Sequence, residues 1–166
     1  MEDLKVKYNE LKSELTNDYD LTRQMCLIAC LYLNHGVIRG NELIETYISP
    51  NDVCEYDNYI DIENKKMIIG KHKSMKSMGT RTIDLCDEFM ELIHDFPNRL
   101  FVTNNSGSAY KDATGLTKKM KKVFGNGIYD YRYAKSSINL QGIDTELATN
   151  QGHQIGTQVK YYRKYI

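Results

Sequence analysis

The chain has 166 residues, of which 41% are hydrophobic and 27% are charged, and its formal net charge is zero. A chain of this size and apolar content can bury the core of one domain without disulfides or metals to hold it together. No apolar run is long enough to cross a bilayer and no basic-then-apolar leader is seen, so we expect a soluble intracellular protein with neither a membrane span nor a secretory signal.

The first part of the chain predicts three helices. Residues 2–15 place leucines among charged residues, which predicts an amphipathic helix. Residues 21–34, with Asp20 as the capping residue and Gly36 as the stop, are apolar nearly all round, so we expect this helix at the centre of the fold. Residues 40–47 predict a third helix that ends before a proline, because the residue preceding proline is disfavoured in the helical region.

The rest of the chain adds a small sheet and further helices. Three short β-favouring runs, separated by a polar turn and a lysine-rich loop, predict an antiparallel meander over residues 59–62, 67–69 and 80–85. We then expect a helix at residues 86–94, a short extended segment at residues 100–103 and a loop at residues 104–108. Later helices are predicted at residues 113–124, 131–139, 145–150 and from 157 onward. The predicted fold class is α+β, mostly helical with a small three-stranded antiparallel sheet on one side.

The four cysteines, Cys26, Cys30, Cys54 and Cys86, form no CxxC pair and have no accompanying histidine cluster. This pattern disfavours a zinc site. Cys26 and Cys30 lie four residues apart on one face of an apolar helix, so we expect buried, reduced thiols.

The neutral total charge conceals a polarised chain. Residues 1–60 carry five basic and eleven acidic side chains, whereas residues 61–166 carry seventeen basic and eleven acidic ones. Lysines and arginines displace counterions from phosphates, so basic clusters favour DNA as a partner, although similar clusters also occur as plain solvated faces. The clustered positions are Lys65, Lys66, Lys71, Lys73, Lys76, Arg81, Lys111, Lys118, Lys119, Lys121, Lys122, Lys160, Arg163 and Lys164.

Four short segments combine arginine, lysine, histidine and tyrosine in a definite order. They are Arg39-Gly-Asn-Glu42-Leu43, then Gly70-Lys71-His72-Lys73 with a strand opening at Arg81, then Tyr129-Asp-Tyr-Arg132, then Gly152-His153 followed by Tyr162. In order and spacing they resemble the Arg-x-x-Glu-Leu box, the lysine-bearing hairpin, the His-x-x-Arg box and the Gly-His and nucleophile segment of the tyrosine recombinase (phage integrase) family. The resemblance covers about residues 20–166 and implies a single catalytic domain over residues 1–166, without the family's separate N-terminal core-binding domain.

The chemistry of these residues suits cleavage of a phosphodiester, which needs a nucleophile, donors to the non-bridging oxygens and an acid for the leaving oxygen. Arg39 and Arg132 can each present a planar fork of donors to the phosphate. His153 can donate one further hydrogen bond. The resemblance implies that Tyr162 attacks phosphorus to form a covalent 3′-phosphotyrosine. Its neighbour Tyr161 is a rival, and the nine-residue offset from the histidine favours Tyr162.

The resemblance also assigns supporting roles. It favours Lys71 as the acid that protonates the 5′-oxygen, with Lys73 and Lys76 as rivals. Glu42 lies on the same side of its helix as Arg39 and is expected to hold the active-site architecture. We expect DNA contacts from Lys73, Lys76, Arg81, Lys118, Lys119 and Lys122. With this set of cations around the phosphate no metal or other cofactor is required, so we expect cleavage in EDTA.

One position departs from the family pattern, because Tyr129 stands where the family usually has histidine. A phenol can donate a hydrogen bond to the phosphate, so we interpret the chain as a variant enzyme. Type IB topoisomerases share the fold and commonly lack this histidine, and they are one alternative function. A DNA-binding accessory protein without catalysis is the other. The expected partner is double-stranded DNA, bound by a chain that is a monomer in solution and that self-associates on DNA, as family members form tetramers there.

Overall fold

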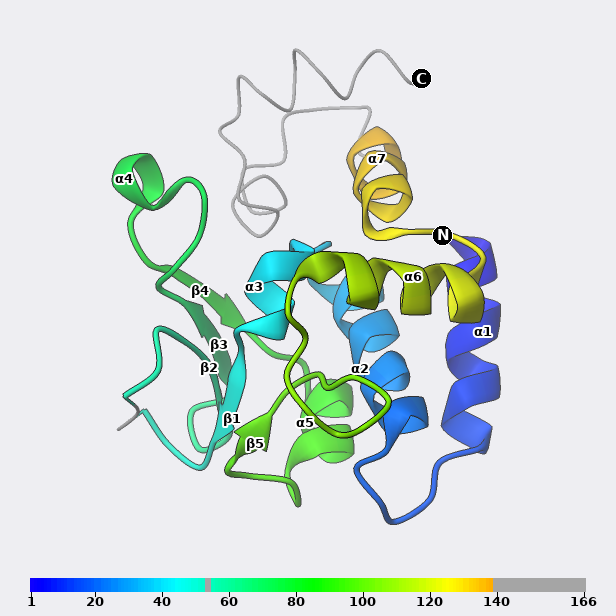
Figure 1. The fold of residues 1–166 in the computed structure, drawn as a ribbon, viewed down its shortest axis with the longest axis horizontal. Coiled ribbons are helices and arrows are strands. Elements are labelled where there is room, and N and C mark those ends of the chain that lie inside the picture. Colours follow the sequence, from blue (N-terminus) through cyan, green and yellow to red (C-terminus); the bar gives the residue numbers. More distant parts are fainter. Residues whose placement is uncertain (53–54, 139–166) are drawn as a thin grey trace.

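The computed structural model describes residues 1–52 and 55–138, which form seven helices and five strands (Figure 1). The helices are α1 (Glu2–Ser13), α2 (Leu21–Asn34), α3 (Gly40–Ile44), α4 (Met75–Met78), α5 (Asp87–Ile93), α6 (Ala113–Phe124) and α7 (Ile128–Ile138). The strands are β1 (Tyr47–Ser49), β2 (Asn58–Asp61), β3 (Lys66–Ile69), β4 (Arg81–Asp84) and β5 (Arg99–Leu100). The predicted α+β class, with helices predominating, is confirmed.

Helix α2 lies at the centre of the fold, as its apolar composition predicts. Every residue from 24 to 32 is buried, so the helix has neighbours on all sides. Its N-terminus is capped by Asp20, whose carboxylate accepts a hydrogen bond from the backbone N–H of Arg23 at 2.9 Å. Beyond its C-terminus Gly36 adopts a φ of 136°, a conformation that favours glycine.

The predicted three-stranded meander is present, but it is part of a larger sheet. Strand β3 pairs antiparallel with β2 on one side and with β4 on the other. Ile60, Met67 and Ile83 form one buried row across the three strands. Strand β1 adds a parallel pair to β2, and β5 pairs antiparallel with β1. Within the described residues the sheet therefore has five strands, in the order β4-β3-β2-β1-β5, rather than three.

The prediction of a helix over residues 40–47 is wrong in its second half. Helix α3 ends at Ile44, and the chain enters β1 at Tyr47. Ile48, at the middle of β1, is fully buried, with Ile60 and Arg99 as its Cα partners on the two neighbouring strands. Pairing on both sides satisfies the backbone of β1, and this gain overrides a weak local preference for helix.

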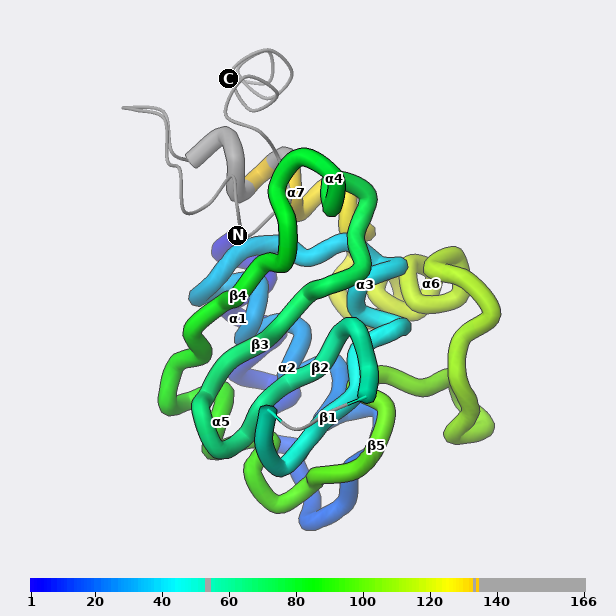
Figure 2. The backbone as a smooth tube through the Cα atoms, turned by 90° about the vertical axis from the view of Figure 1, so that its left-hand side faces the viewer, coloured from blue at the N-terminus to red at the C-terminus, as the bar shows by residue number. Residues whose placement is uncertain are grey.

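The sheet and the helices form two sides of one core. Figure 1 shows the sheet at the left and α1, α2, α6 and α7 at the right. Figure 2, turned by 90°, places strands β1 to β4 nearest the viewer with α2 behind them. The buried row of the sheet and the buried face of α2 belong to one hydrophobic cluster, which also includes Phe89 of α5 and Phe101 after β5.

The later helices follow their local signals closely. Helix α6 has the predicted bounds, with an Asp112 cap on the Thr114 N–H at 2.8 Å and a left-handed Gly125 at its end. Helix α7 begins at Ile128, three residues earlier than predicted, and the Asp130 carboxylate accepts a hydrogen bond from the Gly127 N–H at 2.8 Å. The helices predicted at residues 145–150 and from 157 lie outside the described residues.

The cysteines behave as buried thiols where the structure describes them. Burial raises the pKa of Cys26 to about 11 and that of Cys30 to about 12, so both stay protonated at neutral pH. Cys86 is a half-buried thiol, and Cys54 lies outside the described residues. Over residues 1–52 and 55–138 there is no helix both long and apolar enough to cross a membrane.

Candidate functional site

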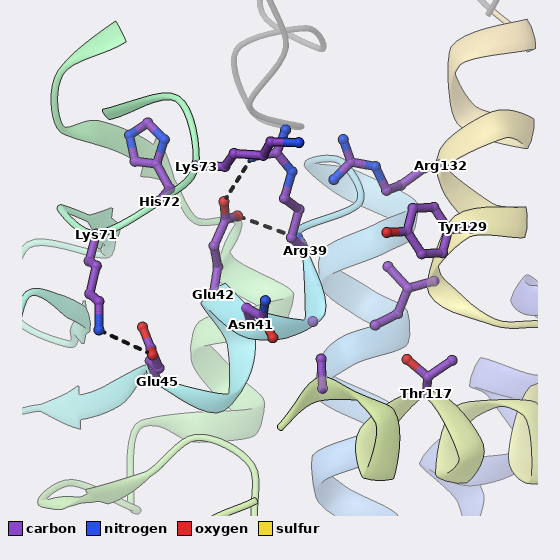
Figure 3. A pocket seen from close by; sticks show the side chains of 13 residues that line it. Arg39, Asn41, Glu42, Glu45, Lys71, His72, Lys73, Thr117, Tyr129 and Arg132 are labelled. Atoms are coloured by element: carbon purple, nitrogen blue, oxygen red, sulfur yellow. Dashed lines mark hydrogen bonds and ion pairs between the residues drawn. The ribbon is translucent and has the colours of Figure 1, made fainter. Parts of the chain in front are cut away.

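A cavity of about 670 Å³ lies where α3, α6, α7 and the loop between β3 and β4 meet (Figure 3). Four segments that are distant in the sequence contribute to its wall. The lining residues are Arg39, Gly40, Asn41, Glu42, Glu45, Lys71, His72, Lys73, Ala113, Thr117, Ile128, Tyr129 and Arg132. The cavity therefore brings together residues from three of the four segments that the sequence singled out.

The two arginines enter the cavity from different segments of the chain. Arg39 is the residue before α3, and its side chain is 24% exposed. Arg132 lies on the second turn of α7 and is buried, with 3% of its surface exposed. Two guanidinium groups that line one cavity can present several fixed donors to an anion such as a phosphate.

Glu42 is the only carboxylate among the cavity residues that is buried in the described structure. Its Oε1 lies 3.6 Å from Nη1 of Arg39, and its Oε2 accepts a hydrogen bond from the Arg39 backbone N–H at 3.4 Å. The two residues lie three apart at the start of α3, so helix geometry sets their separation. Glu42 thus lies beside Arg39, the residue that it is predicted to support.

The predicted DNA contact of Arg81 does not agree with its position. Its side chain is 1% exposed and Nη2 donates a hydrogen bond to Oε2 of Glu42 at 3.1 Å. Burial is the largest effect on Arg81 and lowers the pKa of its guanidinium, while the nearby Glu42 raises it. A side chain held in the interior by a carboxylate does not reach a duplex at the surface, so Arg81 is corrected from a DNA contact to an internal partner of Glu42.

The lysine loop between β3 and β4 borders the cavity with Lys71, His72 and Lys73. The Lys71 side chain is 65% exposed and its Nζ lies 3.3 Å from Oε1 of Glu45, which also lines the cavity. One nitrogen of the His72 ring, Nε2, hydrogen-bonds with the Gly79 carbonyl at 2.7 Å, which closes the loop on itself. Of the three candidate acids, Lys71 and Lys73 line the cavity, whereas Lys76, on α4, does not.

Tyr129 lies one helical turn before Arg132 on α7 and is 72% exposed. Figure 3 shows its ring beside Arg132 with the hydroxyl turned toward Arg39. Tyr129 therefore faces the cavity, with its phenol available to a ligand. A phenol at this place can donate one hydrogen bond to an anion bound between the arginines.

Helix α6 carries the other predicted DNA contacts along its length. Lys118 and Lys122 are exposed, whereas Lys119 is half-buried and hydrogen-bonds with Oδ1 of Asn105. Burial, followed by the neighbouring Lys122, lowers the pKa of Lys119. None of these three side chains lines the cavity, so they form a basic surface outside it.

Several residues of the cavity wall were not predicted from the sequence. Asn41 lies on α3 and Glu45 directly follows it, and Ala113 and Thr117 lie four residues apart on one face of α6. Helical spacing alone could have grouped each pair, but nothing local indicates that α3 packs against α6. The remaining predicted residues, His153 and Tyr162, and the rival Tyr161 lie outside the described residues.

Comparison with known proteins identifies the fold. No protein-family model and no curated protein sequence matches this chain. Among solved structures it is similar to a crystal structure of XerA recombinase, with a TM-score of 0.67 and 13% sequence identity. The match covers 98% of this chain and 57% of the recombinase, so the chain spans little more than half of that protein's length. The chain therefore has a tyrosine recombinase-like fold.

Proposed function

We propose that this chain, which has the fold of a tyrosine recombinase catalytic domain, cleaves and rejoins DNA strands in site-specific recombination. The observation that supports this best is the cavity in which Arg39, Lys71, Tyr129 and Arg132 meet. Two arginines and a lysine are residue types that the family's phosphate site needs, and Tyr129 stands in place of the usual histidine. The four residues come from segments as far apart as α3 and α7. Double-stranded DNA is the proposed partner, with self-association on paired sites.

The proposed reaction assigns one task to each group. The guanidinium groups of Arg39 and Arg132 bind the non-bridging oxygens of the scissile phosphate, with hydrogen bonds from Tyr129 and His153. The Tyr162 oxygen gives up its proton to solvent and attacks phosphorus, and the bond from phosphorus to the 5′-oxygen breaks as Lys71 donates a proton to that oxygen. The phosphotyrosine bond preserves the energy of the broken linkage, so a 5′-hydroxyl can reverse the reaction and rejoin a strand.

The decisive experiment is the trapping of the covalent adduct. Nicked duplexes that lose a short fragment after cleavage are incubated with the protein in EDTA, and denaturing gels reveal a protein-linked 3′ end. We expect the adduct with the wild-type chain and with Tyr161→Phe, and its loss in Tyr162→Phe. An adduct lost only in Tyr161→Phe would contradict the assigned nucleophile. A folded wild-type chain that forms no adduct on any duplex, while still binding DNA, would support the accessory-protein alternative.

The exposed Tyr129 also supports a second candidate, a type IB topoisomerase, because those enzymes commonly lack the histidine at this place. The two functions share the cleavage step but differ in the strand to which the cut end is rejoined. Relaxation of supercoiled plasmid without preference for a sequence is expected of the topoisomerase. Strand exchange between two copies of one site is expected of the recombinase.

A further inference from the structure

The Arg81 side chain forms a buried ion pair that joins the sheet to α3. Arg81 opens β4, and its partner Glu42 lies 39 residues earlier, on α3. The two side chains are 1% and 3% exposed, and Nη2 of Arg81 lies 3.1 Å from Oε2 of Glu42. A carboxylate this deeply buried requires a cation beside it, because the protein interior solvates an isolated charge poorly.

Glu42 faces two guanidinium groups at once. Its Oε1 lies 3.6 Å from Arg39 Nη1, while its Oε2 accepts from both the Arg39 backbone N–H and the Arg81 side chain. The single negative charge of Glu42 thus lies between two positive charges. Arg81 neutralises the charge of the Glu42 carboxylate from the interior side. Arg39, Glu42 and Arg81 together therefore carry one net positive charge, at Arg39, which borders the cavity.

We propose that Arg81 is a positioning residue for Arg39 and acts through Glu42, an inference that rests on the DNA cleavage proposed above. Because Arg81 neutralises Glu42, the carboxylate can orient Arg39 without neutralising it. When Arg81 is removed, Glu42 retains Arg39 as its cationic neighbour. The Arg39 guanidinium then binds the carboxylate in place of the scissile phosphate, and the cavity loses one positive charge.

The surroundings of Arg81 agree with this role. The charges of Arg39 and Arg132 each lower the pKa of Arg81. The Arg81 guanidinium is therefore close enough to both cavity arginines to interact with them electrostatically. Its Nε and Nη1 are buried and have no hydrogen-bond partner among the described residues. Arg81 therefore contributes one charge and one direct hydrogen bond, both directed at Glu42.

The test compares Arg81→Met, Glu42→Gln and the double variant by single-turnover cleavage of the trapping duplex at saturating DNA. We expect Arg81→Met to be slower by about a hundredfold, the effect of misplacing one donor to the reacting oxygens. The double variant removes the uncompensated carboxylate, so it is expected to cleave at least about tenfold faster than Arg81→Met. Lys66→Met, which removes an exposed cation of β3, is the matched control and is expected to cleave at the wild-type rate. A double variant no faster than Arg81→Met overturns the proposal.

A second readout does not depend on cleavage. The Nε–Hε NMR signal of Arg39, assigned by its loss in Arg39→Lys, is expected to shift in Arg81→Met and to return toward the wild-type position in the double variant. An Arg39 signal that is the same in Arg81→Met and in the wild-type chain overturns the proposal. If the wild-type chain forms no adduct, the proposed function fails, while this signal still decides whether Arg81 positions Arg39.

A conservative variant covers the case in which Arg81→Met does not fold. Arg81→Lys keeps the neutralising charge, and Arg81 makes a single direct hydrogen bond to Glu42, which an ammonium can also donate. Arg81→Lys is therefore expected to cleave within about tenfold of the wild-type rate and to leave the Arg39 signal near its wild-type position. A folded Arg81→Lys chain that is slower by about a hundredfold overturns the proposal.

Discussion

At the scale of single residues, the cavity offers two lysines for one chemical task. Lys71 and Lys73 both border it, and Nζ of Lys71 lies 3.3 Å from Oε1 of Glu45 (Figure 3). Both side chains are exposed, so burial does not distinguish them. The family pattern favours Lys71, and the structure adds that Lys76 on α4 does not line the cavity. The choice therefore lies between two residues of one loop.

The first prediction concerns the acid that protonates the leaving oxygen. Lys71→Met is expected to slow cleavage by about 10² to 10⁴-fold, the usual contribution of a general acid. A duplex with sulfur in place of the scissile 5′-oxygen should restore the rate, because a thiolate leaves without protonation. Lys73→Met and Lys76→Met are compared at saturating oxygen duplex, where a lost DNA contact no longer limits binding, and their cleavage step is expected near the wild-type rate. Rescue by sulfur in Lys73→Met, and not in Lys71→Met, would reverse the assignment.

At the scale of elements, the cavity depends on how closely α3 approaches α6 and α7. A Cβ added at Gly40 would lie 2.8 Å from Cβ of Ala113 and 2.9 Å from Cδ1 of Ile128. These distances are shorter than van der Waals contact, so the first residue of α3 must be small for the three helices to meet. The same packing brings Arg39 and Arg132 to the wall of one cavity.

The second prediction tests this packing. Gly40→Ala is expected to lower the free energy of unfolding by about 1–3 kcal/mol, because an added methyl group overpacks the contact between helices. Urea denaturation measures the change. Adding Ile128→Val removes Cδ1 and should recover part of the loss, whereas Ile128→Val alone should destabilise the chain. If Gly40→Ala leaves the free energy of unfolding unchanged, α3 must lie further from α6 than these distances indicate.

A third prediction concerns the contact between α1 and α5. Nζ of Lys12 lies 2.7 Å from Oε1 of Glu88, and the two side chains are 45% and 41% exposed. The Lys12 ammonium, with a smaller contribution from the nearby Tyr8 hydroxyl, lowers the pKa of Glu88 below its ordinary value of 4.5. A carboxyl whose pKa is lowered on folding stabilises the protein above its unfolded pKa and loses this effect as the pH falls through the folded value.

Glu88→Gln is therefore expected to be less stable than the wild-type chain at pH 7, by about 0.5 kcal/mol for a pair this exposed. The difference should shrink from pH 7 to pH 3, because the wild-type carboxyl loses its charge as the pH falls through its lowered pKa. Urea denaturation midpoints of Glu88→Gln and the wild-type chain, compared at pH 7 and at pH 3, measure the difference at each pH. In a Lys12→Met background, Glu88→Gln should lower the free energy of unfolding by less at pH 7. An equal difference at pH 7 and pH 3 would show that the charge of Glu88 contributes nothing.

At the scale of the whole molecule, charge separates along the chain. The second part holds the excess of basic residues, and α6 presents Lys118 and Lys122 to solvent outside the cavity. Lys119, on the same helix, already contacts Asn105. Exposed lysines beside a phosphate site extend the surface that a duplex can follow, so the proposed DNA partner would contact both the cavity and α6.

The fourth prediction measures that surface through the salt dependence of DNA binding. Lys118→Gln and Lys122→Gln are each expected to reduce the slope of log K against log salt by about 0.9, the value for one lost phosphate contact. Lys119→Gln should reduce it less, because its side chain is engaged with Asn105. Substitutions of Lys5 and Lys7 on α1 serve as controls and should leave the slope unchanged. Equal slopes for all five variants would exclude α6 from the DNA surface.

Local signals account for most of the elements. The bounds of α6 and the cap of α2 were predicted correctly, because capping residues, left-handed glycines and apolar periodicity act within a few residues. The three meander strands were predicted correctly for the same reason. Arg39, Lys71, Tyr129 and Arg132 were chosen by motif and spacing, and the fold brings all four to one cavity.

By itself, then, the sequence determined most of the helices, the meander and the main polar residues of the cavity, since each carries a signal in its neighbours along the chain. Only the tertiary structure decided that residues 47–49 form a strand and that Arg81 is buried. Both depend on distant partners: β1 gains its hydrogen bonds from β2 and β5, and Arg81 gains its countercharge from Glu42. A basic side chain looks the same in sequence whether it faces a phosphate or a carboxylate, and the fold determines which one it meets.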